Sequence, residues 1–294
     1  MPKIVQFTHP GPEHKPDNKK KNHKSWNTGA HKRKFLLAKG NYIDNNVIKE
    51  NELMFWGEWE PPSWVKQLEN KPTPFHPEWL HSPYLPTILP KSTGYQQSYQ
   101  NTDPCVLDGQ FKYFVCKQFK PKNRTLTPLA KLEKGSLILF GSTGRQNTDN
   151  AFFQLDTVFV VSDFIEYDIS DENALISSGF NNYRNYSFKM AFPEPENFSL
   201  KLRLYLGATF QNQIKGMYSY SPSQLWKDQL KGFPRVPLKD MEYITNNLNA
   251  APKVTDVTID DVIDFWKKIK EIVKQNECVE GVYFTSRSEN DNYI

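Results

Sequence analysis

Residues 136–168 constrain the fold more than any other part of the chain. Their sequence, SLILFGSTGRQNTDNAFFQLDTVFVVSDFIEYD, contains two runs rich in β-branched and aromatic residues, separated by a polar segment. Apolar residues alternate along the second run, as in a strand whose two faces meet different surroundings. This stretch therefore predicts a strand, a polar loop and a long second strand, and it is the clearest β unit of the chain.

Residues 258–275 change from this alternation to a helical period. In TIDDVIDFWKKIKEIVKQ the apolar residues recur every three or four positions, which predicts an amphipathic helix whose apolar stripe faces its own domain. Thr258 and Asp261 have the spacing of an N-terminal capping pair. The predicted fold class is α+β, a curved or barrel-like mixed sheet with this C-terminal helix packed on it. Further strands are predicted at residues 32–44, 52–60, 110–119, 200–210 and 215–222, with an edge strand at 280–284.

Charge is distributed unevenly along the chain. Residues 1–34 carry a formal charge of +7, whereas the whole chain of 294 residues carries +4, so residues 35–294 carry −3. This difference predicts a basic N-terminal arm over residues 1–34 and a single α+β domain over residues 35–294. A basic arm on a near-neutral body suits a polyanion, although a solvated lysine-rich tail has the same composition.

A long irregular segment is expected within that domain at about residues 70–104. It contains seven prolines, and proline fixes the backbone and removes a hydrogen-bond donor. Its aromatic residues favour packing over disorder, and we interpret the segment as an ordered coil excursion. These rings are Phe75, Trp79, Tyr84, Tyr95 and Tyr99.

Cysteine use and hydropathy favour a soluble, cytoplasmic protein. Cys105, Cys116 and Cys278 are odd in number and have no CxxC spacing, which argues against a disulfide framework and a cysteine zinc site. The chain has no run of 18 apolar residues and no apolar run typical of a signal peptide, so no membrane association is predicted.

Four of the six histidines precede residue 32, and two of them flank a short loop, THPGPEH. Zinc needs three or four ligands at ordered spacing, and this segment lacks a third carboxylate or cysteine ligand, so no metal and no other cofactor are predicted. We interpret the loop as a rigid turn that places His9, Glu13 and His14 at a cleft, where histidine can carry protons near neutral pH. An ordinary surface loop is the alternative.

The segment FWGEWEPPSW combines tryptophans with two glutamates around Gly57. In a strand, Trp56, Glu58 and Glu60 face one side and Trp59 faces the other. One interpretation is a ring-lined slot in which Trp56 and Trp59 stack on a base while Glu58 binds the base edge or acts as a general base. The other is a core strand with solvent-facing glutamates.

Asp156 is a carboxylate inside an otherwise apolar strand. Because an unpaired buried carboxylate is costly, Asp156 needs a partner, and Arg145 in the preceding loop or a ligand is the expected one. The loop sequence GSTGR offers backbone N–H groups and a guanidinium to an anion, but it lacks the spacing of a nucleotide-triphosphate loop. A hairpin turn is the simpler interpretation of this loop.

The sequences LEKGSLILFGS and FFQLDTVFVVSDF, within residues 132–165, together resemble the core of PUA-like modules of the ASCH and EVE type. In those families the corresponding strands build a small barrel. The resemblance implies binding of RNA or of modified DNA bases, often in systems that modify or restrict nucleic acid. It also implies that a flipped base occupies an aromatic slot, for which the Trp56 and Trp59 segment is the candidate.

These observations predict a nucleic-acid or modified-nucleotide binding protein of a bacterial or phage modification or defence system. Its partner would be DNA, RNA or a nucleotide, with phosphate contacts positioning the chain and base contacts giving specificity. The alternative is an enzyme acting on a nucleotide or nucleotide sugar, in which His9, Glu58 and Asp156 share acid–base catalysis. An assembly component is the third possibility. The predicted phosphate contacts are Lys19, Lys20, Lys21, Lys32, Arg33, Lys34 and Arg145.

Overall fold

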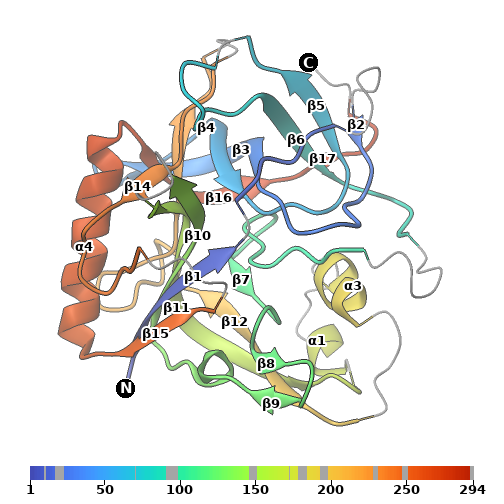
Figure 1. Cartoon of the computed structure of the whole chain (residues 1–294), viewed down its shortest axis with the longest axis vertical. Helices are drawn as coiled ribbons and strands as arrows, with labels where there is room; N and C mark the ends of the chain where they lie inside the picture. Colours follow the sequence, from blue (N-terminus) through green and yellow to red (C-terminus); the bar gives the residue numbers. More distant parts are fainter. Residues whose placement is uncertain are drawn as a thin grey trace.

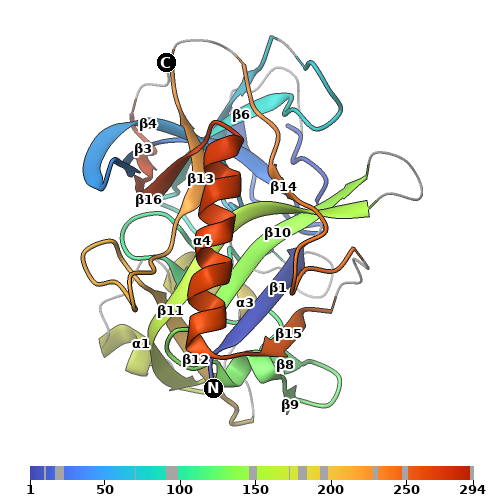
Figure 2. The same cartoon turned by 90° about the vertical axis from the view of Figure 1, so that its left-hand side faces the viewer.

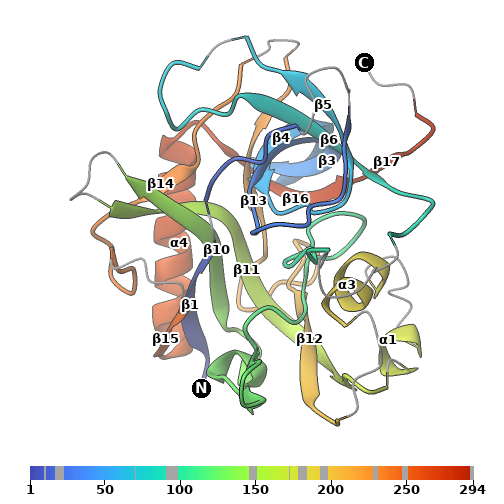
Figure 3. The same cartoon turned by 45° about the vertical axis from the view of Figure 1, so that its right-hand side comes forward.

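Two mixed β-sheets and one long helix form the framework of the computed structural model (Figure 1). The structure describes residues 1–9, 11–16, 23–69, 71–90, 99–145, 151–171, 173–177, 184–192, 198–227, 231–246 and 251–291. Figure 3 shows the second sheet, with β3, β5 and β6, above the first sheet, with β1, β11 and β12.

The first sheet has the strand order β15-β1-β10-β11-β12-β7, and β14 also pairs with β11. Its centre is the predicted hairpin of β10 and β11. The register shifts between Phe140 and Gly141, where a Cβ on the glycine would lie 2.1 Å from the Gln154 carbonyl oxygen. The bulge therefore requires glycine. The strands are β1 (Lys3–His9), β7 (Lys112–Tyr113), β10 (Leu137–Arg145), β11 (Ala151–Asp168), β12 (Lys201–Gly207), β14 (Val236–Leu238) and β15 (Lys253–Asp256).

The second sheet has the order β16-β13-β4-β3-β6-β5-β2, with β17 beside β6. Asn45 and Asn46 join β3 to β4 with φ angles of 49° and 61°, which suit a tight hairpin turn. β16 pairs with both β13 and β3, so the predicted edge strand has partners on both sides. The strands are β2 (His23–Lys24), β3 (Lys34–Asp44), β4 (Val47–Gly57), β5 (Ser63–Gln67), β6 (Trp79–Leu85), β13 (Ser221–Leu225), β16 (Val279–Thr285) and β17 (Arg287–Ser288).

The predicted C-terminal helix is confirmed as α4 (Ile259–Gln275), which Figure 2 shows lying along the first sheet. Thr258 accepts from the Asp261 N–H, and the Asp261 side chain accepts from the Thr258 N–H, so the predicted cap is a complete capping box. The remaining elements are β8 (Phe119–Lys120), β9 (Thr125–Leu126), a 3-10 turn (Pro128–Lys131), α1 (Asn173–Ser177), a π-helical turn (Arg184–Phe188) and α3 (Lys189–Ala191).

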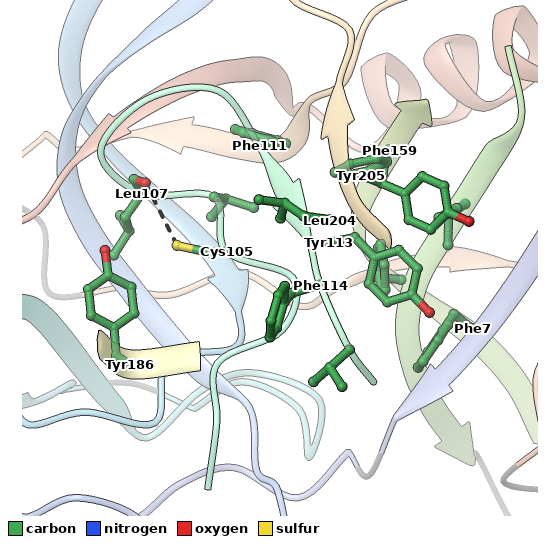
Figure 4. Close-up of a cluster of buried hydrophobic side chains, with 14 of the residues drawn as sticks. Phe7, Cys105, Leu107, Phe111, Tyr113, Phe114, Phe159, Tyr186, Leu204 and Tyr205 are labelled. Atoms are coloured by element: carbon green, nitrogen blue, oxygen red, sulfur yellow. Dashed lines mark hydrogen bonds between the residues drawn. The ribbon is translucent and has the colours of Figure 1, made fainter. Parts of the chain in front are cut away.

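The first sheet is buried on both faces. Ile4 and Leu137 point into the cluster that also contains Trp266 of α4, whereas Phe7 points into a cluster on the other face. Figure 4 shows part of this second cluster, in which Phe7 lies near Tyr113 and Tyr113 stacks on Tyr205 with ring centroids 5.6 Å apart. The coarse α+β class is therefore confirmed, with the sheet as the middle layer.

The N-terminal segment is not an arm where the structure describes it. β1 pairs in parallel with β10 and antiparallel with β15, in the interior of the first sheet. Arg33 and Lys34 are 1% and 0% exposed, so the prediction that both contact phosphates is wrong. Lys19, Lys20 and Lys21 lie outside the described residues.

The Pro-rich segment also differs from its prediction. β6 lies within the predicted coil excursion. Pro83 lies inside this strand, opposite Ser63 of the neighbouring strand β5. Tyr95 lies outside the described residues. Among the described residues, no helix is long and apolar enough to cross a membrane.

Candidate functional site

Charged side chains from both sheets meet in the interior. Four of them form what we call the buried ionic chain, namely Glu58, Arg33, Asp156 and Arg235. Arg33 Nη1 donates to Glu58 Oε2 at 2.6 Å, and Arg33 Nε lies 3.1 Å from Asp156 Oδ2. Arg235 Nε lies 2.9 Å from Asp156 Oδ1. Two carboxylates and two guanidinium groups alternate, so the chain is neutral as a whole.

Backbone geometry explains how this chain forms. Arg33 precedes β3, Glu58 follows β4, and the β3–β4 pairing begins at Lys34 opposite Gly57, so the two side chains leave neighbouring strand ends. Asp156 lies in the first third of β11, and Arg235 directly precedes β14, which pairs with β11. The ionic chain therefore links the two sheets.

Asp156 has partners other than the one expected. Arg33 and Arg235 bind its carboxylate, whereas Arg145 is exposed at the end of β10. Burial raises the pKa of Asp156, and the charges of the two arginines oppose that rise. The need for a partner was predictable from the strand pattern, but its identity depends on contacts between distant segments.

His9 extends the chain beyond Glu58. Its Nδ1 lies 2.7 Å from Glu58 Oε2, and both side chains are buried. Burial lowers the pKa of His9 to about 4, although the Glu58 carboxylate opposes this shift. His9 is therefore neutral at neutral pH, and because Glu58 can only accept, the proton of the imidazole lies on Nδ1.

His31 is protonated, in contrast to the neutral His9. Its Nδ1 lies 2.9 Å from Glu60 Oε1 and 3.4 Å from Glu58 Oε1. Burial opposes protonation, but the Glu58 charge and the hydrogen bonds to both carboxylates raise the pKa of His31 to about 10. His31 is therefore an imidazolium at neutral pH and neutralises the second buried glutamate.

His31, Glu58 and Glu60 bring possible metal-ligand atoms within 4.8 Å of one another. Their oxygens already accept hydrogen bonds. Glu58 accepts from His9, Arg33 and the Asp103 N–H, and Glu60 accepts from Asn27 Nδ2 at 2.6 Å. Protonated His31 supplies positive charge at the same position, so the set is satisfied without a metal ion.

A pocket of about 530 Å³ lies at the Arg235 end of the buried ionic chain. The Arg235 guanidinium lies over the Trp56 ring, 4.0 Å from its centroid, and Trp56 Nε1 donates to the Phe233 carbonyl. Arg235 Nη2 is buried and has no hydrogen-bond partner among the described residues. Other lining residues include Gly11, Glu13, Lys15, Lys71, Phe75, His76, Thr143, Arg145 and Gln154.

The two tryptophans do not form one slot. Trp56 belongs to the cluster that contains α4, whereas Trp59 belongs to the cluster on the other face of the first sheet. Trp59 is 0% exposed, packs on Tyr186, and donates from Nε1 to the Pro62 carbonyl at 2.9 Å. Only Trp56 lines the pocket, and its face is covered by Arg235.

The remaining candidates separate into buried and peripheral groups. Lys34 Nζ donates to the Pro61 carbonyl at 2.8 Å in the interior, and Lys32 is half-buried. Glu13 lines the pocket, and His14 is buried, with its N–H bound to the Arg33 carbonyl. Of the predicted acid–base residues, the structure places His9 against Glu58 and joins Asp156 to Glu58 through Arg33.

Arg235 was not singled out from the sequence. It stands in FPRVPL without a motif, and it becomes informative only when its contact with Asp156 is seen. No family model matches the chain, and neither curated proteins nor solved structures include a significant match to it.

Proposed function

We propose that this protein binds a nucleotide in the pocket at Arg235, with the nucleotide either free or presented by a nucleic-acid strand. The observation that carries the proposal is the unpartnered Arg235 Nη2, a buried donor of a residue that lines the pocket. Such a donor is costly unless an acceptor meets it, and a phosphate oxygen is a suitable acceptor.

The charge of the lining supports an anion. Lys15, Lys71, Arg145 and Arg235 line the pocket with Glu13 as the opposing carboxylate. Glu78 lies outside the lining and forms ion pairs with Lys15 and Lys71. When its charge is counted as well, the net charge of these side chains remains positive. A basic concave surface raises the local concentration of anions.

The rings and the size of the pocket support a base. Phe75 and His76 line it and are half-buried, which leaves ring surface for stacking. A volume of about 530 Å³ lies within the range typical of small-molecule sites. In this proposal Asp156 positions Arg235, and Arg33, which is itself bound by Glu58, holds Asp156.

The PUA-like resemblance extends the proposal to modified bases and to nucleic-acid modification or defence. The two strands that carry the resemblance, β10 and β11, form the hairpin at the centre of the first sheet, and Arg145 at the end of β10 lines the pocket. Arg145 and Lys15, which are exposed and line the pocket, take the phosphate-contacting role in place of Arg33 and Lys34.

Calorimetric titration tests the proposal with three probes: inorganic phosphate, a mixture of nucleoside 5′-monophosphates, and a short single strand of mixed sequence. We expect the nucleotides to bind more tightly than phosphate, and binding of the strand to weaken steeply with salt. Arg145→Ala and Lys15→Ala should each weaken binding about fivefold, equivalent to ~1 kcal/mol.

Lys201→Ala is the matched control, because Lys201 is an exposed cation on β12 outside the pocket lining. Tighter binding of the strand than of free nucleotides would assign the nucleic acid as the source. Equal affinity for phosphate and nucleotides, or equal loss in the control, would contradict the proposal.

A further inference from the structure

A second arrangement of reactive groups lies at the His9 end of the buried ionic chain. Cys116, in the segment between β7 and β8, places its Sγ 3.5 Å from His9 Nε2. The other imidazole nitrogen, Nδ1, lies 2.7 Å from Glu58 Oε2. A thiol, an imidazole and a carboxylate thus stand in the order of nucleophile, base and orienting acid.

The backbone around Cys116 is held by a buried carboxylate. Asp103 accepts the N–H groups of Phe114, Val115 and Cys116 at 2.7, 2.7 and 2.6 Å. The Tyr113 hydroxyl donates to the Cys116 carbonyl at 2.7 Å. These contacts fix the position of the sulfur relative to His9, as a nucleophile requires.

The protonation states of Cys116 and His9 allow a hydrogen bond between them. The pKa of His9 is about 4, so its Nε2 carries a free electron pair at neutral pH, and Glu58 holds the proton on Nδ1. Burial raises the pKa of the Cys116 thiol well above its ordinary value. The resting pair is therefore a neutral thiol facing a neutral imidazole, so the S–H can donate to Nε2.

We infer that Cys116, His9 and Glu58 form a nucleophilic triad for acyl transfer from an ester or thioester. Cys116 and His9 are the catalytic residues, and Glu58 is a positioning residue. Nothing in this inference depends on the pocket at Arg235, so it stands apart from the proposed nucleotide binding.

The reaction begins when the Cys116 proton moves to His9 Nε2 and the sulfur attacks the acyl carbon. The bond from the acyl carbon to the leaving oxygen or sulfur then breaks, and the imidazolium returns its proton to the leaving group. Water, deprotonated by His9, hydrolyses the resulting thioester and releases a carboxylic acid and the free thiol. Lys117 is the cation next to the thiol, and its charge lowers the pKa of Cys116 against the burial.

The cysteines of the chain make the test selective. Cys105 and Cys278 are 1% and 7% exposed, whereas Cys116 is half-buried, and all three are free thiols. A small ester therefore meets Cys116 first. The reagent is p-nitrophenyl acetate, which reports acylation as released nitrophenol.

The full chain should release a burst of about one equivalent of nitrophenol and gain one acetyl group on the Cys116 peptide. Cys116→Ala should abolish both signals, and Cys278→Ala should retain them. Lys201→Ala, an exposed position on β12 outside both the pocket lining and the triad, should leave the burst unchanged. A full burst from Cys116→Ala overturns the inference.

Rate and amplitude separate chemistry from folding in variants of buried residues. The burst amplitude reports the fraction of folded protein, and the burst rate reports the triad. His9→Gln should slow the burst about 100-fold or more, and Glu58→Gln should slow it about tenfold with an unchanged half-saturating ester concentration. A lower amplitude with an unchanged rate assigns both residues a structural role only and overturns the inference.

The pH profile of the wild-type chain gives a test without substitution. The groups facing His9 are Glu58, Arg33 and His31. Those facing Cys116 are Asp103, Glu58, Lys117 and Arg33. Proton transfer to neutral His9 gives a burst rate that varies less than about tenfold from pH 5.5 to 8, even as Asp103 ionises with its pKa of about 7. An isolated thiol reacts about tenfold faster per pH unit over the same range, and that result overturns the inference.

Discussion

The buried ionic chain and the outer surface of α4 use the same residue types in opposite surroundings. On the helix, Asp264 and Lys267 form an ion pair at 3.6 Å with side chains 70% and 64% exposed. In the buried ionic chain, Arg33 and Asp156 are paired at 3.1 Å with side chains 2% and 3% exposed. Water stabilises each member of the surface pair alone, whereas each buried member depends on its neighbour.

The energetic contribution of an ion pair therefore depends on its burial. A buried charge without its partner keeps its desolvation penalty and loses the interaction that offset it. A surface charge without its partner loses little, because solvent takes the place of the partner.

Arg33→Met should lower the free energy of unfolding by about 3–5 kcal/mol, because it leaves Glu58 and Asp156 buried with one cation fewer. Urea unfolding measures the change. Lys32→Met is the matched control at the adjacent, half-buried position, and its cost should stay within about 0.5 kcal/mol. Equal losses of unfolding free energy at the two positions would show that Arg33 gains no special weight from its place in the buried ionic chain.

His31→Gln tests the buried imidazolium through its pH dependence. The pKa of His31 is about 10 in the fold and 6.5 when unfolded, so its contribution is complete below pH 6.5 and is lost as the pH rises toward 10. The stability difference between wild type and variant should therefore shrink by up to about 1.4 kcal/mol per pH unit in that window. Thermal unfolding of both proteins from pH 6 to 10 measures it, and a constant difference would contradict the charged state of His31.

Asp264→Asn on α4 should change the free energy of unfolding by less than about 0.5 kcal/mol, because both partners of its ion pair are exposed. Urea unfolding at low and high salt gives the comparison. A larger effect, persisting at high salt, would make the helix surface resemble the buried chain and weaken the contrast.

Local features of the fold were predictable from the sequence because they depend on neighbouring residues. The β10–β11 hairpin follows from alternation, and α4 with its Thr258 and Asp261 cap follows from period and spacing. Prediction from neighbouring residues failed for the N-terminal segment. A lysine or arginine is predicted to be exposed unless its ion-pair partner is known. Arg33 is buried only because Glu58 and Asp156 reach it from β4 and β11.

The candidate site shows the same limit. The alternation around Asp156 required a partner, yet Arg235 lies 79 positions further along the chain, and no periodicity connects the two. Trp56 and Trp59 lie in different clusters, but β4 ends at Gly57, before Trp59, and which ring meets the pocket depends on the packing of the two sheets. Cys116 drew attention only as a cysteine without a motif, because His9 approaches it from the other end of the sequence.

The place of β1 has a consequence for how the chain is made. Its partners are residues 137–142 on one side and 253–256 on the other. Ribosomes add about 5–20 residues per second, so β1 waits on the order of ten seconds or longer after its own synthesis for its last partner. Ile4, Val5 and Phe7, which end at 1% exposure or less, remain uncovered by that partner until then. β1 is therefore made long before its flanking strand β15, and its apolar side chains wait for that strand before the sheet closes over them.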